Sequence, residues 1–157
     1  MLARTHAAFG FLSAVIMQNF IATGNVIIFF ILVLLGALLP DIDQPNSKLS
    51  NKIPIIPRII SLFSKHRGIF HSLLLALIIP GLIYFFVGQV YGIALFIGYM
   101  SHLLIDGLTI QGINFLHPIA KLHLSGFIET GTVAELVILI SIIVIIVIIL
   151  IWSAAKL

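Results

Sequence analysis

Five apolar stretches, separated by polar connections, run along the chain. They cover residues 7–22, 26–39, 72–88, 91–106 and 133–152. A helix that crosses a membrane needs about 20 predominantly apolar residues, and the last stretch meets that length. The first four are shorter and would extend only about 21–26 Å at about 1.5 Å per residue. The pattern predicts an all-α, polytopic membrane bundle of about five transmembrane helices, with the last helix a lipid-facing scaffold.

The composition supports a membrane protein. Hydrophobic residues make up 61% of the 157 positions and charged residues 8%, whereas a soluble domain carries about 25% charged residues. We expect one membrane domain over residues 1–157, with a site-bearing core at 5–112, a loop at 113–132 and the scaffold helix at 133–153. The first stretch lacks a clear small-x-small cleavage site, so it is predicted to be a retained span rather than a signal peptide.

Lysine and arginine are distributed unequally between the two predicted sides. With five spans, the N-terminus and the loops at 40–71 and 107–132 share one side and hold seven of these residues, while the other side holds only Lys156. Positive residues favour the cytoplasmic side, which predicts a multi-pass protein of the cytoplasmic membrane with the N-terminus inside and the C-terminus outside. Segment 53–64 is predicted to lie in the membrane interface; a lid over the site is the alternative.

Histidines and carboxylates gather on that same predicted cytoplasmic side. His102 lies a full turn inside the fourth stretch, where a polar side chain is costly and usually has a functional partner. Because helices of alternating direction all deliver such residues to one side, we expect a metal site facing the cytoplasm. Its candidate ligands are His6, Asp41, Asp43, His66, His71, His102 and Asp106.

The spacing of these residues suits metal binding. His102 and Asp106 stand four positions apart, which places their side chains on one helix face about 5–6 Å apart. Asp41 and Asp43 follow a helix end and could bridge or support cations. Arg67 lies in the segment between two candidate histidines, and its guanidinium could neutralise a substrate phosphate, although ordinary snorkelling at the interface is equally compatible.

The donor set also restricts the metal. The chain contains no cysteine, which excludes disulfides, thiolate sites and cysteine nucleophiles. Imidazole with carboxylate fits zinc, in one or more ions, and manganese or magnesium are alternatives. Such a centre lowers the pKa of bound water to about 7 and polarises a phosphoryl or carbonyl oxygen.

Three short motifs in order resemble those of one family. They are Gly36–Asp43, His66–Ser72 and His102–Thr109, preceded by Thr5-His6. This pattern resembles the YdjM-type family of LexA-regulated, membrane-bound metal-dependent hydrolases. The resemblance implies a helical membrane fold related to the zinc-dependent phospholipase C and nuclease group. It makes His6, Asp41, His66, His71, His102 and Asp106 ligands, adds Asp43, and matches Glu135 to a further acidic position.

The leading hypothesis is a phosphoesterase acting on a phospholipid or lipid-linked phosphate, with Asp43 as general base and Arg67 near the phosphate. An intramembrane metallopeptidase or amidase would need Glu129 or Glu135 as its base, and the chain has no His-Glu-x-x-His motif. A non-enzymatic divalent-metal transporter and a purely structural membrane protein are two competing hypotheses. The formal charge of +3 is too small to indicate a nucleic-acid partner. His117, His123 and Glu129 receive no role in the leading hypothesis.

Overall fold

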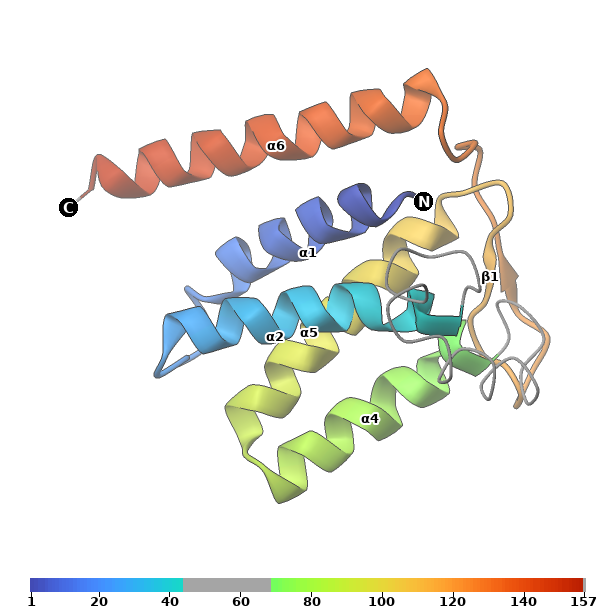
Figure 1. Cartoon of the computed structure of the whole chain (residues 1–157), viewed down its shortest axis with the longest axis horizontal. Coiled ribbons are helices and arrows are strands. Elements are labelled where there is room, and N and C mark those ends of the chain that lie inside the picture. Colours follow the sequence, from blue (N-terminus) through green and yellow to red (C-terminus); the bar gives the residue numbers. More distant parts are fainter. Residues whose placement is uncertain (44–68, 157) are drawn as a thin grey trace.

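The chain is mostly helical in the computed structural model, which describes residues 1–43 and 69–156. The described α-helices are α1 (Ala3–Met17), α2 (Val26–Leu38), α4 (Leu73–Phe86), α5 (Gln89–Gly107) and α6 (Val133–Ala154) (Figure 1). Two short 3₁₀ helices, η1 (Leu39–Asp43) and η3 (Ile69–His71), flank the undescribed segment. A two-residue antiparallel pair, β1 (Ile113–Asn114) with β2 (His123–Leu124), lies in the connection from α5 to α6. The predicted helical class is confirmed, and this small strand pair is an addition to the expected loop.

Two of the described helices, α5 and α6, are long and apolar enough to cross a membrane. Helix α6 has 22 residues and a mean hydropathy of 3.4, so it extends about 33 Å against a hydrocarbon core of about 30 Å. Helices α2 and α4 are apolar but shorter. The full bundle of five spans and its orientation therefore stay predictions.

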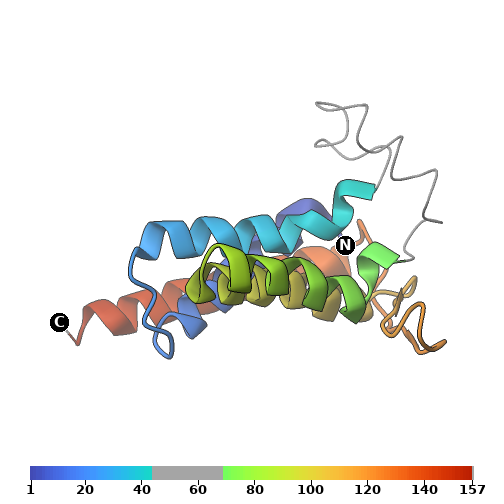
Figure 2. The same ribbon diagram turned by 90° about the horizontal axis from the view of Figure 1, so that it is seen from below.

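Helix α5 is the centre of the assembly, because it packs against α1, α2 and α4, whereas α6 packs on α1. The two views show the helices lying side by side, with their connections gathered at two ends (Figures 1 and 2). The N-terminus, η1, η3, the strand pair and the start of α6 lie at one end, here called the polar end. The C-terminus and the α1–α2 and α4–α5 connections lie at the other.

Glycines allow α2 and α5 to approach closely. A Cβ atom on Gly36 would lie 3.0 Å from the backbone nitrogen of Tyr99, and one on Gly98 would lie 2.8 Å from the backbone nitrogen of Ala37. Neither space would hold a larger residue without a shift of backbone, which is the reason for small residues where membrane helices touch. This contact sets the distance between the polar ends of the two helices.

Helix α1 ends at Met17, five residues before the predicted boundary. The Asn19 side chain donates to the Val15 carbonyl at 3.2 Å, and Gly24 adopts a φ of 61° in the turn that follows. The side chain of Asn25 then caps α2 by accepting from the Ile28 amide at 3.2 Å. These local polar bonds compete with helical ones, and the helix stops although Phe20 and Ile21 continue the apolar pattern.

Candidate metal centre

Five imidazole and carboxylate side chains meet at the polar end of the helices. Helix α1 supplies one, η1 and η3 one each, and α5 supplies two on successive turns. The five residues are His6, Asp41, His71, His102 and Asp106. Four of these side chains are fully buried, and Asp41 is 13% exposed. Of the side chains nominated from the sequence, the structure therefore brings these five together.

His102 is the residue on which this cluster is centred. Its Nδ1 atom lies 2.8 Å from the backbone oxygen of Ala37, and because a carbonyl only accepts, Nδ1 must carry the proton. Its Nε2 atom then has a free lone pair that can bind a metal ion, and it lies 3.3 Å from Nε2 of His71. A backbone carbonyl on the other ring nitrogen is the usual way in which proteins fix the tautomer of a metal-binding histidine.

His6 and Asp106 form the side of the cluster nearest α1. His6 Nε2 lies 3.3 Å from Asp106 Oδ1, but in a geometry that does not make a hydrogen bond, and both His6 ring nitrogens lack a hydrogen-bond partner among the described residues. The amino nitrogen of Met1 also lies 2.5 Å from Asp106 Oδ1. A buried imidazole without a hydrogen bond is costly in an apolar interior, and a bound cation would satisfy one of its two ring nitrogens.

Asp41 marks the more open side of the cluster. Its Oδ1 atom lies 3.8 Å from Nε2 of His71 and 3.8 Å from Nε2 of His102. Burial favours the neutral acid, but the hydrogen bond with His71 and the charges of the neighbouring imidazoles prevail and hold the pKa of Asp41 below its usual value. Asp41 thus offers an anionic oxygen on the part of the cluster that is not fully buried.

The donor set fits a divalent metal ion. Two groups of three residues have ligand atoms within 4.8 Å of one another, namely His6, Asp41 and His102, and His71, His102 and Asp106. Since Nδ1 of His102 is bonded to Ala37, only Nε2 is left for a metal, and both groups depend on that one atom. Among the described residues the two groups therefore cannot each use His102 for a separate ion. Buried imidazole and carboxylate without thiolate is a set that zinc or manganese accepts.

Residues around the cluster hold its ligands in place, and the sequence analysis missed them. The Tyr99 hydroxyl, buried on α5, donates to the backbone oxygen of Phe70 at 2.6 Å and so fixes η3 beside its last residue, His71. The Ser72 hydroxyl donates to the Ile69 carbonyl within the same turn. The signal for Tyr99 was its spacing, because Tyr99, His102 and Asp106 fall on one face of α5.

Glu135 lies at the start of α6 and is 1% exposed. Its Oε1 atom accepts from the Leu2 amide at 2.6 Å and from the Thr5 hydroxyl at 2.7 Å, and its Oε2 atom accepts from the Gly131 amide at 2.7 Å. It belongs to neither ligand group among the described residues. The structure thus places Glu135 where it joins α6 to the first turn of α1, the turn that carries His6.

Three other nominated side chains cannot be placed. His66 and Arg67 lie outside the described residues, as does segment 53–64, and of Asp43 only the backbone is described, at the end of η1. His123 and Glu129 are exposed in the connection from α5 to α6. His123 Nδ1 lies 3.2 Å from Asn114 Oδ1 across the strand pair, so it takes part in that local contact.

Comparison with known proteins gives the family. The chain is 36% identical over 111 residues to a Bacillus subtilis protein described as "Uncharacterized protein YvsG", an alignment covering 66% of each chain. It is 36% identical over 91 residues to "Inner membrane protein YdjM" of Escherichia coli, covering 54% of this chain and 46% of that one. The alignments thus span only part of the length of these relatives. No solved structure matches the chain.

The family described as "YdjM inner membrane protein" matches residues 1–156, which is nearly the whole chain. The match includes the two described helices that are long enough to span a membrane and all five members of the cluster. The resemblance seen in the sequence motifs is therefore confirmed at the level of the family: the chain belongs to the YdjM family of inner membrane proteins.

Proposed function

We propose that this protein is a membrane-embedded, metal-dependent phosphoesterase that acts on a phospholipid or a lipid-linked phosphate at the cytoplasmic surface. The observation that carries the proposal is the convergence of three imidazoles and two carboxylates from four separate segments onto one buried position. Buried charges and imidazoles destabilise a fold when they have no partner to bind. Inside a membrane protein such residues commonly mark a functional site.

The residues of the cluster would have different roles in binding the metal ion. His102 presents Nε2 because Ala37 holds its Nδ1 proton, and Asp41 contributes an anionic oxygen on the accessible side. A divalent ion held by these groups would supply a polarised phosphoryl oxygen and a water that deprotonates near neutral pH. Burial of the other four side chains excludes bulk water from the ligands and strengthens every electrostatic contact there.

The distribution of polar side chains favours a hydrolase over a transporter. The buried polar residues of the described helices and their connections lie at the polar end, and none is found in the half of the assembly that contains the C-terminus. They are Thr5, His6, His71, Ser72, Ser101, His102, Asp106, Thr109 and Glu135. A transporter usually places its polar site near the bilayer midplane, between helices that provide a path to both sides. A site at one end, close to the depth of lipid headgroups, suits a reaction on a headgroup phosphate.

The test begins with metal content. Purified protein should contain about one equivalent of zinc or manganese by elemental analysis, lost in His102→Ala and kept in His123→Ala, whose imidazole lies outside the cluster. The same preparations should release phosphate or a phosphorylated headgroup from phospholipid or prenyl-phosphate substrates in vesicles, and a chelator should stop the release. A metal-loaded protein that hydrolyses no phosphoester, or one that carries metal ions across the vesicle membrane, would overturn the proposal.

A further inference from the structure

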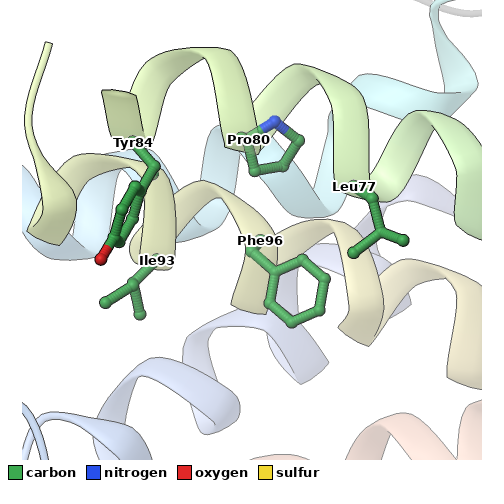
Figure 3. A pocket seen from close by; sticks show the side chains of 7 residues that line it. Leu77, Pro80, Tyr84, Ile93 and Phe96 are labelled. Carbon is green, nitrogen blue, oxygen red and sulfur yellow. The ribbon is translucent and has the colours of Figure 1, made fainter. Parts of the chain in front are cut away.

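An apolar groove lies between α4 and α5, away from the metal cluster. Leu77, Pro80 and Tyr84 of α4 lie on one side and Ile93 and Phe96 of α5 on the other (Figure 3). Gly81 and Gly92 complete the lining, and the cavity volume is about 210 Å³. The lining side chains carry a single polar atom, the hydroxyl of Tyr84. Such a surface offers an occupant shape and apolar contact but almost no hydrogen bonds.

The two glycines have opposite effects on the shape of this groove. At Gly92 the helices nearly touch, because a Cβ atom there would lie 2.5 Å from Cα of Tyr84. At Gly81, by contrast, a Cβ atom would meet nothing within 4 Å. The helix pair is thus closed at Gly92 and open around Gly81, which makes the groove a feature of packing rather than a general looseness between helices.

The surroundings of the groove identify its occupant as hydrocarbon. The chain belongs to a family of inner membrane proteins, and α5, one wall of the groove, is itself long enough to span the membrane. On α4, Leu82 is 52% exposed and Phe85 81% exposed beside the groove, as expected for a helix that faces lipid. A volume of about 210 Å³ is below the range of about 300–1,000 Å³ typical of sites that enclose a whole small molecule. It suits part of a flexible chain.

Helix α5 carries one wall of the groove and two members of the metal cluster, and η3, which ends at His71, precedes α4. Leu77 follows His71 by six positions and Tyr84 follows it by thirteen, while Phe96 precedes His102 by six. Along α5, at about 1.5 Å per residue, Phe96 lies about 9 Å and Ile93 about 14 Å from His102. Half of the hydrocarbon core measures about 15 Å. A lipid with its phosphate at the cluster would therefore have its chains at the depth of this groove.

We propose that the groove between α4 and α5 binds a hydrocarbon chain of the lipid substrate and thereby selects long-chain phosphates. This inference rests on the proposed function for the word substrate, but the binding of a chain can be measured without turnover. The lipid would enter the groove from the side, directly from the bilayer. Its headgroup would then reach the cluster while the chain stays in an apolar environment. Burial of each additional methylene favours binding, and this makes chain length a determinant of specificity.

The binding test uses Gly81→Leu, which adds a side chain at a groove position where a Cβ atom would meet nothing within 4 Å, and Leu82→Phe as the matched control on the exposed surface. The protein in phosphatidylcholine vesicles is irradiated with a phosphatidic acid that carries a diazirine in its acyl chain. We expect cross-links to peptides 77–84 and 92–96 that fall by about fivefold or more in Gly81→Leu and persist in Leu82→Phe.

Cross-links that are equal at Phe85 and in the groove and are unaffected by Gly81→Leu would show only a lipid annulus. Cross-linking of one chain to another would assign the groove to a second copy. Either result overturns the proposal.

The turnover test compares long-chain and short-chain phospholipids, with a water-soluble phosphoester as the reference for each variant. Gly81→Leu should lower the ratio of long-chain to short-chain rates by about tenfold, whereas Leu82→Phe should leave the ratio unchanged. An unchanged ratio in Gly81→Leu would overturn the role in selecting substrate. If the unmodified protein hydrolyses none of these esters, the proposed phosphoesterase function fails, and the cross-linking result alone decides whether the groove holds a lipid chain.

Discussion

The imidazole rings of His6 and His102 are stacked face to face, with ring centroids 3.8 Å apart and ring planes inclined by 10°. The two residues come from α1 and α5, and both rings are fully buried. Stacking restricts the plane of each ring, and for His102 the contact of Nδ1 with the Ala37 carbonyl also fixes which ring nitrogen faces the cluster. A ligand set whose orientation is fixed in this way binds an ion without first ordering its side chains.

Replacement of His6 should therefore weaken metal binding strongly. His6→Ala removes one donor and also the ring against which His102 is stacked, and we expect metal affinity to fall by more than the roughly 10–100-fold loss typical of an outer partner. Competition with a fluorescent chelator measures the affinity. His123→Ala is the matched control, because that exposed histidine lies on β2 outside the cluster. Equal affinity in the two variants would remove His6 from the ligand set.

Glu135 gives a test that separates a ligand from a structural contact. Glu135→Ala would leave the Leu2 amide, the Thr5 hydroxyl and the Gly131 amide without their acceptor, at a cost of about 1–3 kcal/mol for each group that stays buried. Glu135→Gln keeps an oxygen that can accept from Leu2 and Thr5. We expect the Gln variant to retain its metal and the Ala variant to lose both thermal stability and metal affinity. If Gln lowers metal content as far as His6→Ala does, Glu135 binds the ion directly, as the family resemblance suggested.

The close contact between α2 and α5 should be equally sensitive. Gly98→Val would place a branched side chain against the backbone of Val33 and Ala37, and overpacking of this kind costs about 1–3 kcal/mol. Because the Ala37 carbonyl holds His102, we expect the variant to melt at a lower temperature in detergent and to bind metal more weakly. Gly81→Ala adds a Cβ atom that meets nothing within 4 Å. It provides the comparison and should keep the normal melting temperature and metal affinity. A Gly98→Val protein with normal metal affinity would show that this contact does not position the ligand.

The predicted topology can be tested with single cysteines, because the chain contains none of its own. Lys121 lies in the connection from α5 to α6 at the polar end, and Lys156 follows α6 at the other end. We expect a membrane-impermeant maleimide to label Lys156→Cys in intact spheroplasts and Lys121→Cys only in inverted vesicles. Labelling of both positions from the same side would contradict a crossing by α6 and the cytoplasmic placement of the site.

The sequence predicted the positions of the helices well because burial in a helix follows a local pattern. The apolar stretch at 133–152 corresponds to α6 and the stretch at 72–88 to α4. The end of α1 was predicted too late, since the polar bonds of Asn19 interrupt a helix that hydrophobicity alone would continue. The strand pair was missed because two residues on each strand give no periodic signal, and their pairing depends on residues across a turn.

The sequence by itself also nominated the five residues of the cluster. Their types restrict the chemistry, and the alternating direction of successive helices predicts that they meet at one end. The tertiary structure alone decided which atoms are available: the Ala37 carbonyl occupies Nδ1 of His102 and leaves Nε2, and Glu135 joins α6 to α1. It alone revealed the groove between α4 and α5, which exists because the helices touch at Gly92 and stand apart at Gly81. Residue type and spacing are properties of the chain, whereas these distances depend on how separate helices pack.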